Sequence, residues 1–306
     1  MRPISLNILV MSLLLGTGLP VGSGATLGAR TLAVPAAAPV ELVKTPDGGI
    51  QPQAAIDARG VIHLVYLKGD PAAADVYYVR REPGKDGWSV PIRVNSRLGS
   101  AVAVGTIRGA QLALGRGGRV HVVWNGSGAN EPSHGVPLYY TRMNDAGTGF
   151  EPERNLMQFT SMLDGGGSVA ADAAGNVYVA WHANDRPGSG EANRRLWIAR
   201  STNDGRTFSR EAPAYASPTG ACGCCGARAF ADSHGSVYVL YRAATAGVDP
   251  RFVAMVRELL VERAAVERGV EVPRPAVGTL PPSWDVCPAG CCANPRTSRA
   301  ALCGQD

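Results

Sequence analysis

A ten-residue pattern occurs four times in this 306-residue chain at nearly constant spacing. Each copy places a turn glycine before a short alternating strand that ends in an aromatic residue, and the glycines lie 58, 57 and 60 residues apart. The aromatic residues are Tyr66, Trp124, Trp181 and Tyr241. A period of this length, built from short strands, is typical of a radially repeating all-β array such as a β-propeller. The repeat predicts the architecture, but it names no substrate.

Each repeat can be divided into four strands by its alternation of apolar and polar residues. The first strand is short and rich in small residues, and its four copies are Gln53–Ile56, Gln111–Leu114, Ser168–Ala171 and Arg228–Ala231. An Asp-x-x-Gly turn follows in three copies, and Gly115 replaces the aspartate in the second. Four strands per repeat correspond to one propeller blade. We therefore expect about four blades within residues 45–249.

The N-terminus has the pattern of an export signal. Arg2 precedes the apolar run Ile8–Leu15, which is too short to span a bilayer, and small residues follow up to Ala25. We expect a signal peptide at residues 1–25 and an Ala- and Pro-rich linker at 26–44. No later segment reaches transmembrane length, so the sequence predicts a secreted or periplasmic protein without a membrane span.

The composition is that of a folded domain, with 45% hydrophobic and 18% charged residues. The net charge of +5 comes almost entirely from arginine, and no basic run or basic–aromatic stripe occurs. The sequence therefore predicts no nucleic-acid partner.

The turn after the third strand of the third repeat carries a sharper motif, Ser201-Thr-Asn-Asp-Gly-Arg-Thr-Phe208. Its pattern residues are Ser201, Asn203, Gly205, Thr207 and Phe208, and weaker copies lie at 85–88 and 141–150. This motif resembles the Asp-box of bacterial secreted sialidase-like (neuraminidase-like, BNR-repeat) β-propellers. The resemblance implies a structural role for the motif, a glycan as partner, and six blades, of which about four are visible here.

The repeat ends near Asp249, and the composition changes in residues 250–306. Asp249 and Pro250 provide helix-start signals, and the apolar spacing from Arg251 to Arg268 predicts a helix, with an irregular remainder. Two interpretations stay open. Residues 250–306 are a genuine appended tail, or they result from a shifted or truncated reading frame.

Alignment of the repeats assigns several polar residues to structure rather than to chemistry. His63 and His121 occupy the position that Tyr178 and Tyr238 fill in later copies. A position filled by His or Tyr in every copy indicates packing or strand pairing. We therefore predict no metal site and no cofactor.

Residues of the loops that do not repeat are the candidates for function, because loops on a rigid scaffold carry most binding sites. Sialidases need an arginine clamp for a carboxylate, an acid, and a tyrosine paired with a glutamate. The resemblance implies Arg108 and Arg228 for the clamp, Asp164 for the acid and Glu191 as the partner of the tyrosine. The further candidates for substrate binding are Glu131, His182 and Arg194.

The chain departs from the sialidase pattern in two ways. The Arg-Ile-Pro motif of the resembled enzymes does not occur after the predicted signal peptide, and the late blades that supply the tyrosine are not visible. The resemblance thus implies a glycan-directed propeller of the exo-sialidase class with little or no activity. The alternative is a non-catalytic propeller that binds a glycan or a protein through its loops.

The motif Cys222-Gly-Cys224-Cys225 is unusual for a propeller loop. In an exported chain such cysteines favour a disulfide, although thiolates at this spacing also suit a soft metal ion. The available distant partners are Cys287, Cys291, Cys292 and Cys303.

Overall fold

The computed structural model describes residue 40 and residues 42–104, 109–127, 136–184, 191–214, 219–233, 235–244 and 251–255. The chain divides into two units, Met1–Val43 and Lys44–Asp306. The predicted signal peptide and most of the predicted linker lie outside the described residues. All strands of the described residues lie in the second unit.

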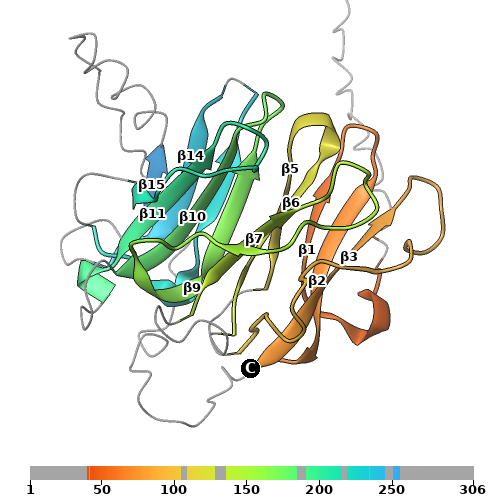
Figure 1. Ribbon diagram of the computed structural model, residues 1–306, viewed down its shortest axis with the longest axis horizontal. Helices are drawn as coiled ribbons and strands as arrows, with labels where there is room; N and C mark the ends of the chain where they lie inside the picture. Colours follow the sequence, from red (N-terminus) through yellow and green to blue (C-terminus); the bar gives the residue numbers. More distant parts are fainter. Residues whose placement is uncertain are drawn as a thin grey trace, which may run out of the picture. The chain divides into compact units, whose positions relative to one another are not determined.

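Its described residues form four consecutive antiparallel sheets, which we call blades 1 to 4 (Figure 1). Blade 1 contains β1 (Ile50–Ile56), β2 (Ile62–Asp70), β3 (Ala73–Arg81) and β4 (Ile92–Arg93). Blade 2 contains β5 (Gln111–Leu114), β6 (Val120–Asn125), β7 (Leu138–Arg142) and β8 (Arg154–Asn155). Blade 3 contains β9 (Ser161–Ala171), β10 (Val177–Asn184), β11 (Arg195–Ser201) and β12 (Ala212–Pro213). Blade 4 contains β13 (Arg228–Ala231), β14 (Val237–Arg242) and β15 (Arg251–Met255).

Within each blade, neighbouring strands follow the order of the chain. Short 3-10 turns lie between or before the strands, at Pro46–Gly48, Arg116–Gly118, Glu191–Asn193 and Gly223–Cys225. The first strands of successive blades contact one another, β1 with β5, β5 with β9, and β9 with β13. This is the arrangement of an all-β propeller, and it confirms the predicted fold class.

The core lies between the blades. Three buried clusters fill the spaces between blades 1 and 2, blades 2 and 3, and blades 3 and 4. Tyr66, Trp124, Trp181 and Tyr241 lie at equivalent positions of the second strands, and each is at most 3% exposed. The structure therefore confirms the predicted equivalence of these aromatic residues.

The turns between first and second strands behave as their sequences predict. The backbone of Gly60 has a φ of +80°, which favours glycine, and Asp57 Oδ1 accepts a hydrogen bond from the Val61 N–H at 2.9 Å. In blade 2, Gly115 stands where the other turns have aspartate. A Cβ atom at Gly115 would lie 2.5 Å from Nε2 of the buried His121, so a larger residue here would need a local shift.

The predicted helix from Arg251 to Arg268 is wrong at its start. Residues Arg251–Met255 form β15, which pairs with β14 from Tyr238–Met255 to Arg242–Arg251. Pairing with β14 satisfies an edge that a helix would leave open, and it outweighs the local helix signals. The rest of the predicted helix and tail lies outside the described residues.

Candidate functional site

The turn Ser201–Phe208 of blade 3 is held by its own side chains. Ser201 Oγ accepts a hydrogen bond from the Gly205 N–H at 2.9 Å, and Asn203 Oδ1 accepts one from the Thr207 N–H at 2.9 Å. Phe208 leaves the turn and packs edge-on against Tyr140 of blade 2, with ring centroids 4.7 Å apart. The turn thus joins two blades.

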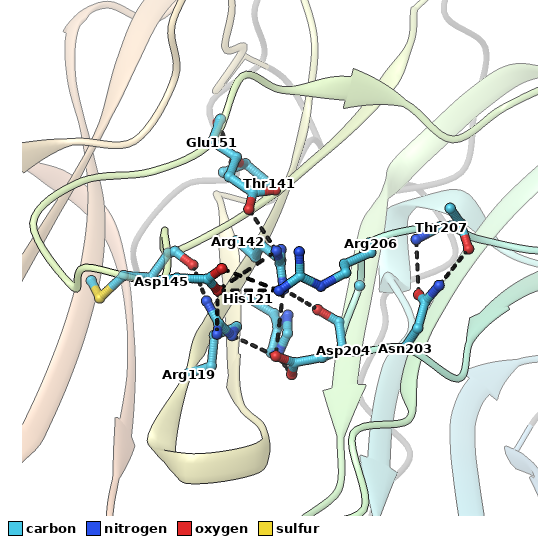
Figure 2. A network of polar contacts seen from close by, with 12 residues as sticks. Arg119, His121, Thr141, Arg142, Asp145, Glu151, Asn203, Asp204, Arg206 and Thr207 are labelled. Atoms are coloured by element: carbon cyan, nitrogen blue, oxygen red, sulfur yellow. Dashed lines mark hydrogen bonds and ion pairs between the residues drawn. The ribbon is translucent and has the colours of Figure 1, made fainter.

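The centre of this contact is the buried carboxylate of Asp204, which is 2% exposed (Figure 2). Its Oδ2 accepts hydrogen bonds from Arg119 Nε at 2.6 Å and from Arg142 Nη1 at 3.4 Å. Arg119 and Arg206 both reach Asp145, at 2.8 and 3.1 Å. Because these partners come from blade 2 and from the turn itself, the network fixes blade 3 on blade 2.

A second contact repeats from blade to blade and was missed by the sequence analysis. Glu211 lies three residues after Phe208, and its Oε1 accepts the backbone N–H groups of residues 158, 159 and 160 at 2.7 to 2.9 Å. Glu153 lies three residues after Phe150 and likewise accepts from the N–H groups of Ser96 and Arg97. The sequence pattern Phe-x-x-Glu, which occurs in these two repeats, could have predicted this contact.

The two repeated histidines have equivalent surroundings, as predicted. Nδ1 of His63 lies 2.7 Å from the Tyr78 hydroxyl, and Nδ1 of His121 lies 2.8 Å from the Tyr140 hydroxyl. Burial lowers the pKa of His63 and lowers the pKa of His121 to about 4. Both histidines are packing residues of the interface with the next blade.

Glu191 and Arg194 lie together in the segment before β11. Glu191 Oε1 accepts hydrogen bonds from Arg194 Nη1 and from the Gly223 N–H, both at 3.2 Å. Arg194 Nη1 also donates to the Ala221 carbonyl at 3.2 Å. These contacts join the segment before β11 to the cysteine-containing segment before β13. Both side chains therefore stabilise the position of these two segments.

Arg228 is exposed and begins β13. Its Nη1 donates a hydrogen bond to Oε1 of Gln111, the first residue of β5, at 2.6 Å. At the aligned positions of β1 and β9, Gln53 Oε1 accepts from the Leu112 N–H and Ser168 Oγ accepts from the Ala229 N–H, at 2.5 and 2.9 Å. The first strands of the four blades thus place aligned polar side chains at one level, and we call these residues the polar tier: Gln53, Gln111, Ser168 and Arg228. Arg228 is the cationic member of this tier.

His182 is fully buried at the end of β10, and neither ring nitrogen has a hydrogen-bond partner among the residues that the structure describes. Burial lowers its pKa to about 3, with a smaller contribution from Arg194. Asp164 pairs with His182 across β9 and β10, although its side chain lies outside the described part. His182 is therefore neutral and has no surface for a substrate in this conformation.

The structure describes the remaining candidate residues only in part. Arg108 and Glu131 lie outside the described residues. Cys222 is buried and Cys225 is half-buried, with Sγ 3.9 Å from Arg242 Nη1, while the side chain of Cys224 is not described. The disulfide stays a prediction. Among the described residues, no group of three or more His, Cys, Asp or Glu side chains could hold a metal ion.

No protein-family model matches the chain. Coproporphyrin III ferrochelatases of Streptomyces griseus and Streptomyces coelicolor are 57% and 54% identical to it over 65 residues. These stretches are 21% of this chain, and the chain spans only 17% of the length of these curated relatives.

Among solved structures, the chain is similar to a protein of unknown function from Dyadobacter fermentans, with 16% identity over 64% of this chain and 62% of that one, at a TM-score of 0.45. It is also similar to the NanB sialidase of Streptococcus pneumoniae, with 10% identity over 66% and 29% of the two chains, at a TM-score of 0.42. The corresponding values for an α-L-arabinanase of Penicillium chrysogenum are 12%, 69%, 63% and 0.44. Similarity this low carries no activity over to the chain, and the propeller fold rests on its own sheets. No helix within the described residues is long and apolar enough to cross a membrane.

Proposed function

We propose that this protein is an exported, sialidase-like propeller that binds an acidic glycan through the loop ends of its first strands and has little or no sialidase turnover. The observation that carries this proposal is the polar tier on the first strands. Its cationic member, Arg228, is exposed and is oriented by Gln111. A guanidinium held in this way suits a carboxylate, which it can bind with two parallel hydrogen bonds.

The Asp-box resemblance is supported by the turn Ser201–Phe208, whose side chains cap its own backbone and whose phenyl ring packs on the preceding blade. Export is part of the same proposal and rests on the N-terminal pattern.

Low turnover follows from what the candidate residues do. Glu191 accepts hydrogen bonds from Arg194 and from the Gly223 N–H, so it is bound to structural partners. His182 is buried and neutral. A glycosidase needs an acid, a nucleophile and a clamp held together, and a small misplacement costs orders of magnitude in rate. The alternative, a non-catalytic propeller that binds a glycan or a protein, needs only the binding groups.

The ferrochelatase reaction is not part of the proposal. The 65 matching residues cover only 17% of the length of those enzymes.

The test combines turnover and binding on the purified chain. We expect no measurable release from a fluorogenic sialoside, and weak binding of sialyllactose by saturation-transfer NMR that falls at least about fivefold in Arg228→Ala, because one charged contact is lost. The matched control is Arg59→Ala, which removes another exposed arginine, at the turn after β1.

Robust release of sialic acid that disappears in Arg228→Ala and Asp164→Ala would show a complete catalytic site and overturn the proposed lack of turnover. Equal binding by the wild type and Arg228→Ala would remove the proposed glycan site.

A further inference from the structure

Two cysteines lie three positions apart on one short turn before β13. Cys222 precedes the 3-10 turn Gly223–Cys225, Cys225 is its last residue, and Gly226 ends it with a φ of +64°. In such a turn the side chains of residues i and i+3 lie on the same side, whereas those one or two positions apart do not face each other. The Cα atoms of residues i and i+3 also lie within about 7 Å, a separation that a disulfide can bridge. The backbone therefore favours a bond between Cys222 and Cys225 within the motif.

Arg242 of β14 contacts both cysteines. Its carbonyl oxygen accepts a hydrogen bond from the Cys222 N–H at 2.9 Å, and its Nη1 lies 3.9 Å from Cys225 Sγ. A guanidinium beside a sulfur stabilises the thiolate, which is the form that attacks disulfides and electrophiles. Cys225 is therefore the nucleophilic member of the pair.

The two cysteines differ in exposure. Cys225 is half-buried, whereas Cys222 is only 2% exposed. Glu191 holds the backbone on both sides of Cys222, because its Oε1 accepts the Gly223 N–H at 3.2 Å and its carbonyl oxygen accepts the Ala221 N–H at 3.0 Å. An incoming molecule therefore reaches Cys225 first, and the buried Cys222 is held three positions away, where it can displace that molecule.

We propose that Cys222 and Cys225 form a redox-active dithiol that exchanges with low-molecular-weight disulfides. The Cys225 thiolate attacks one sulfur of such a disulfide, forms a mixed disulfide and releases the other sulfur as a thiolate. Cys222 loses its proton to solvent, attacks the Cys225 sulfur, closes the internal disulfide and releases the second thiolate. The protein thus loses two electrons and two protons, and the small disulfide gains them to become two thiols. The proposal is independent of glycan binding.

The first test treats the mildly reduced full chain with oxidised glutathione, alkylates the remaining thiols and maps the products by mass spectrometry. Trypsin cuts after Arg210 and Arg228, so one peptide contains all three cysteines of the motif. We expect this peptide to lose two hydrogens through an internal disulfide, and we expect reduced glutathione to reverse the change, because a cross-link over so short a loop adds little stability.

Single variants identify the two sulfurs. Cys222→Ser should stop the internal disulfide and leave Cys225 as a mixed disulfide with glutathione. The matched control is Cys224→Ser, which should form the internal disulfide as the wild type does. The proposal is overturned by an internal disulfide that persists in Cys222→Ser or disappears in Cys224→Ser, by a bond to a cysteine of residues 287–303 in its place, or by no disulfide at all.

A second test measures how fast iodoacetamide alkylates Cys225 in a chain that carries both Cys222→Ser and Cys224→Ser. Arg242→Gln should lower this rate at least about threefold, because the thiolate loses its cationic neighbour. Arg242→Lys should restore most of the rate, which a merely structural role of Arg242 would not require. The control is Arg59→Gln, which removes an exposed arginine of blade 1. A rate that Arg242→Gln leaves unchanged overturns the assignment of Cys225 as the attacking thiol.

Discussion

At the scale of the residue, repeat alignment identified packing residues. It predicted that His63 and His121 would have equivalent neighbours, and each contacts a tyrosine hydroxyl of the adjacent strand. It could not predict the burial of His182 or the contacts of Asp204. Arg119, the strongest partner of Asp204, lies 85 residues away in sequence, so only the folded arrangement of two blades brings these side chains together.

Buried histidines, His63, His121 and His182, make the stability of the propeller depend on pH. The pKa of His121 falls from its ordinary value of 6.5 to about 4, and that of His182 to about 3, in both cases mainly through burial. The unfolded chain therefore binds protons more readily than the folded one. The contribution of these histidines to the free energy of unfolding is complete above pH 6.5 and is lost as the pH falls toward 4. At pH 5, His121 and His182 should each have cost about 2 kcal/mol.

The variant His182→Asn tests this dependence, because Asn125 fills the aligned position of blade 2 and is equally buried. The difference in the free energy of unfolding between pH 7.5 and pH 5, measured with urea, should be smaller in the variant by about 2 kcal/mol. An unchanged difference would mean that His182 is not buried in its neutral form.

At the scale of the element, the strands were predictable because their alternation is local, whereas the contacts between blades were not. The inner strands match their predicted positions, and β5 and β13 have the predicted bounds. The strand β15 was mistaken for a helix because its pairing partner, the edge of β14, is not visible in the local sequence. The glutamates at 153 and 211 were missed because their partners are backbone groups of another blade.

Glu211 offers a direct test of the contact between blades 2 and 3. Its Oε1 accepts three backbone N–H groups, and the residue is 5% exposed. Glu211→Ala should lower the free energy of unfolding by about 2–3 kcal/mol, because buried donors lose their acceptor. Glu211→Gln keeps one oxygen acceptor and should cost less.

Chemical denaturation measures both variants, and Glu82→Ala is the control, since Glu82 is half-exposed and pairs with Arg80 at 3.5 Å. A cost for Glu211→Ala no larger than that of the control would contradict the role of Glu211 in joining the blades.

At the scale of the whole molecule, the chain shows a likeness to two unrelated classes of protein. Its repeats form a propeller, and 65 of its residues are 57% identical to ferrochelatases.

If the tail has a separate origin, the propeller should not need it. Each of the three main cores lies between two neighbouring blades and is made of residues before 244. In repeat folds, stability is approximately the sum of such neighbour contacts. A chain of residues 40–255 should therefore unfold in one cooperative transition, with a midpoint within about 5 °C of the full chain by calorimetry. The matched control is residues 40–214, which lacks blade 4 and should lose stability by exposing the blade 3 face. Failure of the 40–255 chain to fold would show that residues 256–306 complete the propeller rather than follow it.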